Sequence, residues 1–294
     1  MLMNLRTKRE ITGVLRERGI HLKRSLGQNL LIDHNLLDYI TRAADVGGGD
    51  VVLEVGSGSG LLTRHLAERA AQVVTVEIDP PMAELCREYT GDLANVSLLV
   101  CDVLASKSKL NPQVEQAVLE ALERPGVVRL KVAANLPYAV GSLVIPVLLE
   151  GPLPVELMVC LVQKEVAERL AAEPGGKEYG ALSVIVQAHA RVGVMRLLRP
   201  AVFFPAPKVD SAVVRLEPAA EMLASIRNYP AFAALVRKMF QHRRKKVAGA
   251  LRLAMESQAP DAVLDRAGID ANVRVQQLGV GQFIRLANEL KAGQ

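Results

Sequence analysis

Short apolar runs rich in valine and leucine alternate, over the first two-thirds of the chain, with longer stretches of helical periodicity. Runs that are apolar throughout and alternate with helices favour a parallel sheet covered on both faces. Helices are expected near 60–70, 80–90, 112–123 and 140–150, over 164–172, and from Gly180 onwards. We therefore predict an α/β fold with seven strands, the last two antiparallel: Val51–Val55, Val73–Ile78, Val96–Val100, Val128–Ala133, Leu157–Val162, Arg191–Leu198 and Ala212–Leu216.

The pattern changes near Pro218. Residues 219–294 contain no convincing strand, and helical segments are expected near 229–241, 243–256, 260–267 and 279–292, with Pro260 and Gly268 as punctuation. This indicates three parts: a basic N-terminal segment (1–24), an α/β domain (25–218) and a small all-helical domain (219–294).

The net charge of +5 is divided unevenly along the chain. Residues 1–24 carry seven Lys/Arg against two Asp/Glu, residues 25–218 carry 17 against 23, and residues 219–294 carry 12 against 6. Basic ends around an acidic centre suit contact with phosphates. A basic surface kept for solubility is the alternative.

Several classes of protein are disfavoured. No apolar run reaches the length of a membrane span, and the basic residues at the start are not followed by a signal-peptide core. Cys86, Cys101 and Cys160 have no paired spacing, which argues against a disulfide set and a metal site. We expect a cytoplasmic protein without a membrane segment or a metal.

A glycine-rich turn follows the first strand. Gly56, Gly58 and Gly60 would let a ligand approach the backbone closely. Glu77 ends the second strand, where a carboxylate can accept ribose hydroxyls, and Asp102 follows the third, where it can meet an adenine amino group. A dinucleotide and S-adenosylmethionine both fit this layout. Leu61 stands where the dinucleotide pattern has glycine, so S-adenosylmethionine is favoured.

The tetrapeptide Asn135-Leu136-Pro137-Tyr138 follows the fourth strand. The Asn135 amide oxygen is a neutral hydrogen-bond acceptor, the carbonyl of Leu136 or Pro137 can be a second one, and Tyr138 offers a face for a base to stack on. This combination suits a site that orients an exocyclic amino group. Phe203 is the candidate for the other face of the base, and Phe204 is the expected core residue.

A basic cluster lies in the helical tail. Its members are Arg237, Lys238, Arg243, Arg244, Lys245 and Lys246. We interpret it as a contact to an RNA backbone, with a solvated helix face as the alternative.

From about Leu22 to Leu290 the chain resembles the small-subunit ribosomal RNA adenine N6-dimethyltransferases of the KsgA (RsmA) type. The resemblance rests on the glycine turn, on Asn135–Tyr138, and on further motifs: Leu26-Gly27-Gln28-Asn29-Leu30-Leu31, Gln163-Lys164-Glu165-Val166, Tyr179-Gly180-x-Leu182-Ser183, Phe203-Phe204-Pro205-Ala206-Pro207-Lys208-Val209-Asp210-Ser211, Arg243–Lys246 and Gly268-Ile269-Asp270. It implies a Rossmann-like class I methyltransferase sheet. It also implies dimethylation of two adjacent adenines in the 3′-terminal hairpin of small-subunit ribosomal RNA, within a pre-ribosomal particle.

The resemblance also implies that Asn29, Leu31 and Asn135 bind the cofactor together with Gly56, Glu77 and Asp102. Taken alone, Asn29 would instead be interpreted as the cap of a helix beginning near Asp33. We expect the protein to act as a monomer.

The chain departs from the family pattern at three places. Ser57 stands where proline is common, Leu30 where phenylalanine is common, and residues 103–127 form a longer connection that suggests an extra surface helix. Three rival hypotheses remain: an adenine methyltransferase for large-subunit ribosomal RNA, a non-catalytic assembly or transcription factor, and a dinucleotide oxidoreductase.

Overall fold

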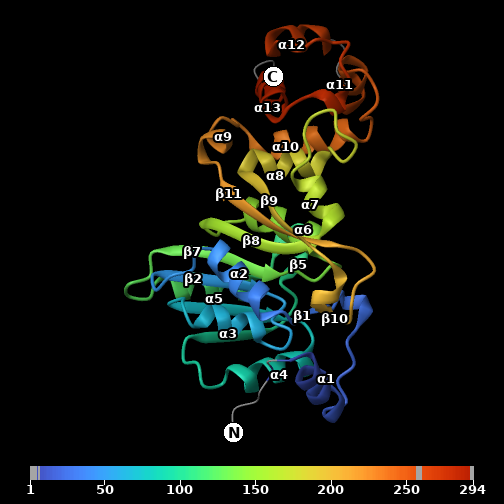
Figure 1. Ribbon diagram of the computed structural model, residues 1–294. Helices are drawn as coiled ribbons and strands as arrows, with labels where there is room; N and C mark the ends of the chain where they lie inside the picture. The colour runs from blue at the N-terminus through green and yellow to red at the C-terminus, as the bar shows by residue number, and fades with distance from the viewer. Residues whose placement is uncertain (1–4, 6, 256–259, 292–294) are drawn as a thin grey trace. The chain divides into compact units, whose positions relative to one another are not determined.

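The computed structural model describes Leu5, residues 7–255 and residues 260–291, and the chain divides into two compact units (Figure 1). The first comprises Met1–Ala167 and Gly193–Glu217, and the second Glu168–Val192 and Pro218–Gln294. The division at Pro218 falls at the predicted change of pattern. The segment 168–192, which the sequence assigned to the α/β domain, groups instead with the C-terminal helices.

A seven-stranded sheet contains all the predicted strands and confirms them. The order is β4-β3-β2-β7-β8-β11-β9. The first five strands of this order run parallel, and β11 is antiparallel to β8. The bounds are β2 (Asp50–Val55), β3 (Gln72–Glu77), β4 (Val96–Val100), β7 (Arg129–Asn135), β8 (Val155–Gln163), β9 (Ala190–Leu198) and β11 (Ser211–Pro218).

Helices pack on the sheet because its inner strands are rich in valine; every residue of β2 and β3 is buried. One apolar cluster joins the sheet to α1 (Lys8–Glu17), α2 (His34–Ala43), α3 (Leu61–Ala67) and α4 (Pro80–Thr90). Helix α5 (Pro112–Leu122) contacts β2 and β3, and α6 (Gly141–Glu150) contacts β8.

Several short elements of the first unit were not predicted. Helix α1 begins at a capping box formed by Thr7 and Glu10 and buries Ile11 and Leu15, so the basic N-terminal segment contributes to the core. Strands β1 (Leu30–Leu31) and β10 (Phe203–Phe204) pair with each other. The connection after β4 contains a hairpin of β5 (Leu104–Ser106) and β6 (Lys109–Leu110), followed by the expected extra helix α5.

Over its described residues the second unit is mainly helical, and it includes only the first residues of β9 and the last residue of β11. It has its own core, in which Phe232, Phe283 and Tyr179 are fully buried. The helices are α8 (Ala181–His189), α9 (Ala220–Ala224), α10 (Tyr229–Phe240), α11 (Val247–Met255), α12 (Pro260–Ala267) and α13 (Val280–Lys291), and α7 (Lys164–Leu170) leads into the unit. The helix ends predicted at 256 and 292 lie outside the described residues.

The run 243–246 was expected to open a helix, but it is not helical. Its backbone is bonded elsewhere: Gln276 N–H donates to the carbonyl of Arg243, and Val275 N–H donates to the carbonyl of Lys245. Helix α11 therefore begins only at Val247.

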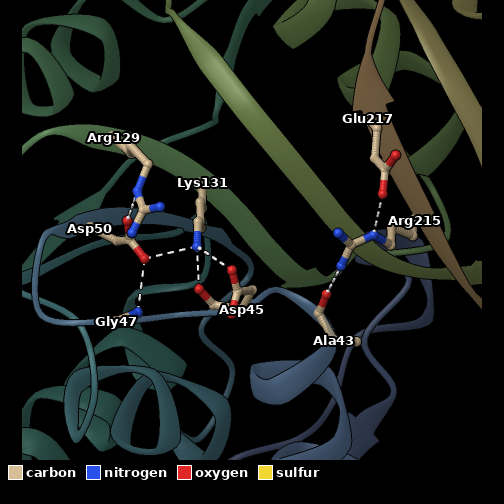
Figure 2. A network of polar contacts seen from close by, with 8 residues as sticks. All are labelled: Ala43, Asp45, Gly47, Asp50, Arg129, Lys131, Arg215 and Glu217. Carbon is tan, nitrogen blue, oxygen red and sulfur yellow. Dashed lines mark hydrogen bonds and ion pairs between the residues drawn. The ribbon is translucent and has the colours of Figure 1, made fainter.

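A network of buried charges ties together the amino-terminal ends of β2 and β7 (Figure 2). The carboxylate of Asp50, which is 0% exposed, accepts hydrogen bonds from Arg129 Nε at 2.8 Å and Gly47 N at 2.8 Å, and pairs with Lys131 Nζ at 2.9 Å. Lys131 Nζ also donates to the carbonyl oxygen of Asp45. Each buried charge in the network has a partner of opposite sign. The amino-terminal ends of β2 and β7 are therefore held together without an unpaired buried ion.

We predict that Asp50→Ala lowers the free energy of unfolding of the first unit by about 3–5 kcal/mol, because Lys131 then keeps a buried charge without its main partner. Urea unfolding measures the change. Glu84→Ala is the control, since it removes an exposed ion pair to Arg87 on α4 and should leave stability almost unchanged. Equal losses in the two variants would contradict the role given to the network.

Candidate active site

The candidate site lies at the carboxyl ends of four neighbouring strands. Gly56 follows β2, Glu77 ends β3, Asp102 follows β4 and Asn135 ends β7. The chain order of the strands reverses between β2 and β7, and α/β sheets bind ligands at such a switch point. Two adjoining cavities open here, the larger of about 160 Å³, and Gly56, Glu77 and Pro137 line both.

Most of the predicted site residues line these cavities. One cavity is lined by Asn29, Gly56, Gly58, Glu77, Asn135, Leu136, Pro137 and Tyr138, and Asp102 lines the other. Leu31 lies beside Asn135 in a third, smaller cavity of about 30 Å³ under the glycine turn. Phe203 lines none of the three.

Glu77 holds the glycine turn against the end of β3. Its Oε2 accepts a hydrogen bond from Gly58 N at 2.9 Å, and its Oε1 accepts one from Asp79 N at 3.0 Å. Burial raises the pKa of the Glu77 carboxyl, while the two backbone N–H donors act in the opposite direction. The carboxylate is therefore positioned by the backbone at the cavity wall.

Glu54, for which the sequence analysis predicted no role, lies beneath the same turn. Its Oε2 accepts hydrogen bonds from the hydroxyls of Thr63 at 2.6 Å and Thr75 at 2.7 Å. Burial raises the pKa of the Glu54 carboxyl to about 7, although these two hydroxyls lower it. Glu54, a residue of β2, thus joins this strand to β3 and α3 from inside the core.

The segment before β1 is tied to the residues that follow β3 by a carboxylate that the sequence analysis did not single out. Asp79 is 1% exposed; its Oδ1 pairs with Lys23 Nζ at 2.6 Å, and its Oδ2 accepts from Gln28 Nε2 at 2.9 Å. Gln28 in turn accepts a hydrogen bond from Lys23 N at 2.7 Å. The sequence marks Asp79 only as a residue before Pro80 at a helix start, so nothing local reveals this pairing.

Gly27 brings this segment into contact with the loop that carries Tyr138. Its φ is +68°, and a Cβ atom built on it would lie 2.8 Å from the backbone nitrogens of both Tyr138 and Ala139. Only glycine satisfies both the left-handed conformation and this approach. The two motifs, more than 100 residues apart, therefore form one surface.

Asn29 acts through its backbone and does not cap a helix. Its carbonyl oxygen accepts a hydrogen bond from Asn135 Nδ2 at 2.9 Å, and its own Nδ2 donates to the carbonyl of Gly27 at 3.2 Å. Asp33 is the residue that caps α2, by accepting from Leu36 N at 3.2 Å. The residue-based interpretation of Asn29 as a cap was thus wrong by four positions.

The hydrogen bond to Asn29 orients the Asn135 amide. Because Nδ2 is committed to a backbone carbonyl, Oδ1 is the amide atom left to meet a ligand in the cavity that Asn135 lines. Asn135 ends β7, which pairs with β8 through Leu161, so its backbone is held by the sheet. The side chain is a neutral acceptor with a fixed direction.

The two candidate carbonyls of the loop differ. Pro137 O accepts hydrogen bonds from Val140 N and Gly141 N, both at 3.0 Å, and so closes the turn that opens α6. Leu136 O accepts none from the residues that the structure describes, while Leu136 N donates to Leu161 O. Of the two, the Leu136 carbonyl is the one available to a ligand.

Tyr138 has a fixed ring. Its hydroxyl is hydrogen-bonded to Ser211 Oγ, at the start of β11, and burial raises the pKa of this phenol. The ring is half-buried and lines the cavity next to Asn135. Anchoring one end of an aromatic side chain in this way prepares its face for stacking.

Phe203, the expected second stacking face, is more deeply buried than Phe204, the expected core residue, which packs partly buried against the same core. The Phe203 side chain is 1% exposed and belongs to the core of the first unit, opposite Leu31 in the β1–β10 pair. Phe204 is only half-buried, and Lys8 Nζ lies 5.6 Å from the centre of its ring. Alternation along β10 reverses the assignment, because neighbouring residues of a strand point to opposite sides. Phe203 therefore offers no free face in this structure.

The predicted RNA-binding cluster lies in the helical unit, and its members differ in their partners. Arg243 Nη2 donates to the carbonyl of Lys177 at 2.8 Å, and Nε donates to Gln276 Oε1 at 3.2 Å. Lys238 Nζ donates to Ala254 O at 3.2 Å, and Lys246 Nζ donates to Asn272 Oδ1 at 2.8 Å. All members of the cluster are exposed except Arg243, which is half-buried. Part of the cluster thus supports the fold of its own unit.

Among the residues that the structure describes, no group of three or more His, Cys, Asp or Glu side chains could hold a metal ion. Within the same ranges, no helix combines the length and the apolar character needed to cross a membrane.

Comparisons with known proteins place this site in context. A family model described as "Ribosomal RNA adenine dimethylase" matches residues 19–292. The curated "Ribosomal RNA small subunit methyltransferase A" of Alkaliphilus oremlandii is 40% identical over 270 residues, which are 91% of this chain and 91% of that protein. The protein of the same name from Bacillus mycoides is 34% identical over 294 residues, which are 98% of each chain.

Two solved structures resemble this one over most of its length. A dimethyladenosine transferase from Plasmodium falciparum superposes with a TM-score of 0.74 and 24% identity, covering 90% of this chain and 98% of the other, which shows the fold alone. The 23S rRNA methyltransferase ErmE gives a TM-score of 0.65 and 27% identity, covering 90% of this chain and all of its own. The Rossmann-like methyltransferase sheet is therefore confirmed.

We predict that Gly27→Ala loosens the loop that carries Tyr138, because the added Cβ would collide with two backbone nitrogens. Hydrogen–deuterium exchange of the Val140 and Gly141 amides should become faster, since both depend on the turn at Pro137. Gly19→Ala is the matched control: φ at Gly19 is +63°, but no atom lies within 4 Å of the added Cβ. If the amides in Gly27→Ala exchange as slowly as in the wild type, the close approach of Gly27 to the backbone of Tyr138 does not stabilise this loop.

Proposed function

The chain belongs to the ribosomal RNA adenine dimethylase family, and we propose that it methylates the N6 atoms of two adjacent adenines in the 3′-terminal hairpin of small-subunit ribosomal RNA, with S-adenosylmethionine as donor. The observation that carries the proposal is the orientation of the Asn135 amide. Its nitrogen is bound to the Asn29 carbonyl, so a neutral oxygen is presented at the cavity beside the free carbonyl of Leu136.

The cavity residues fit the parts of S-adenosylmethionine. The Glu77 carboxylate at the end of β3 is suited to ribose hydroxyls, and Gly56 leaves the backbone open to close approach. Ile78 and Val103 provide apolar contacts beside Asp102, whose carboxylate is suited to an adenine amino group. Asn29, Leu31 and Gly58 would enclose the remainder. When bound, the sulfonium supplies an electrophilic methyl group.

The protein's task at the target adenine is orientation. The N6 lone pair is delocalised into the ring, so it becomes nucleophilic only when its two N–H bonds are held out of the ring plane. Asn135 Oδ1 and Leu136 O can each accept a hydrogen bond from one of these N–H groups, which turns the lone pair towards the methyl group. Fixing the reacting atoms in line can supply much of the rate enhancement.

A neutral acceptor suits this reaction better than a carboxylate. A negative charge beside a sulfonium would stabilise the bound reactants more than the transition state, in which the positive charge is dispersed. The amine becomes cationic and acidic only after the methyl group is transferred, and it then loses its proton. No strong base is therefore required of Asn135 or of Tyr138.

Tyr138 is the proposed stacking partner of the target base. The anchored ring would offer a preformed face, and stacking of a base on an aromatic side chain contributes about 1–3 kcal/mol. That is comparable with the few kcal/mol needed to unstack a base. The second transfer to the same nitrogen requires room for one methyl group beside Asn135, and membership of the dimethylase family supports this step.

We further propose that the protein acts as a monomer on a pre-ribosomal particle, in the cytoplasm, and that Arg237, Lys238 and Arg243–Lys246 meet the RNA backbone. Exposed cations in the helical unit support this, since phosphate contacts dominate affinity for RNA.

The decisive experiment is transfer of labelled methyl groups from S-adenosylmethionine to small-subunit and large-subunit precursor particles, followed by mass spectrometry of the RNA. We expect two dimethylated adenines, adjacent in sequence, in the small-subunit RNA alone. Methylation of the large-subunit RNA would favour that substrate instead. No incorporation into either particle would favour a binding role without catalysis.

We predict that Asn135→Ala lowers the methylation rate about 100-fold or more, because a positioned hydrogen-bond partner of the reacting group is lost. Binding of the particle should change little. Single-turnover transfer and filter binding measure the two effects. Asn95→Ala is the matched control. The Asn95 side-chain amide donates to the carbonyls of Ala67 and Ala70, and Asn95 directly precedes β4, at the amino-terminal end of the strand and away from the candidate site. An unchanged rate in Asn135→Ala would remove this residue from the mechanism.

We also predict that Arg244→Gln with Lys245→Gln weakens RNA binding and flattens its salt dependence, with the slope of log K against log salt falling by roughly 1.4–1.8. Arg243 is left intact because it bonds to Lys177 and Gln276 within its unit. Lys107→Gln with Lys109→Gln, on the exposed β5–β6 hairpin, removes the same charge elsewhere. Equal slopes for the two double variants would contradict a specific contact between the cluster and RNA, and would indicate that only the total surface charge matters.

A further inference from the structure

Residues 103–127, the connection in which the sequence analysis expects an extra surface helix, return to the loop that follows β4. The β5–β6 hairpin pairs Leu104 with Leu110, and this pairing brings Asn111 back beside Asp102. Helix α5 then begins at Pro112 and buries Val114 and Val118. The insertion is thus attached to the wall of the larger cavity, which Asp102 and Val103 line.

Asn111 makes three hydrogen bonds at this attachment. Its Nδ2 donates to the carbonyl oxygen of Asp102 at 2.9 Å, and its backbone N–H donates to the carbonyl oxygen of Val103 at 2.9 Å. Its Oδ1 accepts from Gln113 N at 2.9 Å and so caps α5. One side chain therefore connects the start of a packed helix to the backbone of two cavity residues.

The Asp102 carboxylate depends on that backbone. Its Oδ1 accepts a hydrogen bond from Leu104 N at 2.9 Å, which orients the carboxylate within the loop. Oδ2 accepts no hydrogen bond from the residues described and is the oxygen left for a ligand. Asp102 is exposed, so the geometry of its loop must be fixed by other groups.

We propose that Asn111 is a positioning residue for cofactor recognition: by holding the Asp102–Val103 backbone to α5, it sets the carboxylate where it accepts the 6-amino group of adenine. This inference rests on the proposed use of S-adenosylmethionine. It assigns to the segment 103–127 the support of the adenine end of the cavity. Its specific consequence is selectivity between purines, which a merely structural bond elsewhere would not affect.

The test compares S-adenosylhomocysteine with S-inosylhomocysteine, in which an oxygen replaces the 6-amino group. Isothermal titration calorimetry gives both dissociation constants for each variant. Asn111→Ser keeps a side chain that can cap α5 but removes the Nδ2 donor. We expect it to weaken binding of the adenine compound about 3- to 10-fold, as for loss of one hydrogen bond, and to reduce the ratio of the two constants by at least about threefold.

The kinetic readout separates positioning from catalysis. The KM for S-adenosylmethionine should rise in Asn111→Ser, while kcat at saturating donor should stay within about twofold of the wild type, because Asn111 is not among the residues that line the cavity around Asn135. Asn95→Ser is the matched control, since it also removes side-chain bonds to backbone carbonyls. It should leave the ratio of dissociation constants unchanged.

Each outcome decides between hypotheses. A ratio in Asn111→Ser equal to that of the wild type overturns the role of Asn111. A wild-type protein that binds neither compound overturns the proposed cofactor, and the inference with it. If Asn111→Ser does not fold, Asn111→Asp tests the same point, because it retains the capping oxygen and lacks the donor; an unchanged ratio there would be equally contrary.

Discussion

The hydrogen bond between Asn135 Nδ2 and the Asn29 carbonyl is the interaction on which the site depends. It joins the end of β7 to the segment before β1, and it decides which amide atom faces the cavity. The same segment is held from its other side by Lys23 and Gln28, through the buried carboxylate of Asp79. A neutral acceptor gains its direction from contacts that are themselves remote in sequence.

The sequence analysis predicted the strands, most of the helices and the residues at the strand ends, because these features depend on local patterns. All seven strands and most helices follow from the pattern of apolar positions. The placement of Gly56, Glu77, Asp102 and Asn135 at one end of the sheet follows from parallel pairing, because the carboxyl ends of parallel strands lie together. The extra helix after Pro112 was also predicted. These features need only local patterns and the chirality and order rules of α/β sheets.

The rest depends on tertiary contacts that have no local signal. Nothing near Asp79 indicates Lys23 as its partner, and nothing near Gly27 indicates the backbone of Tyr138. Phe203 and Phe204 are chemically alike neighbours, so only the pairing of β10 with β1 decides which ring is buried. The segment 168–192 has helices typical of either unit, and its contacts alone assign it to the second.

The hydrogen bonds that Arg243 makes within its own unit limit what this residue could add to the proposed contact with RNA. A guanidinium that already spans Lys177 and Gln276 has fewer donors left for a phosphate than its neighbour Arg244. The number of counterions displaced on association should therefore be smaller than the number of cations in the run. The formal charge of this run is therefore an upper limit on the number of phosphates that it could neutralise. The shortfall corresponds to cations that are already hydrogen-bonded within the helical unit.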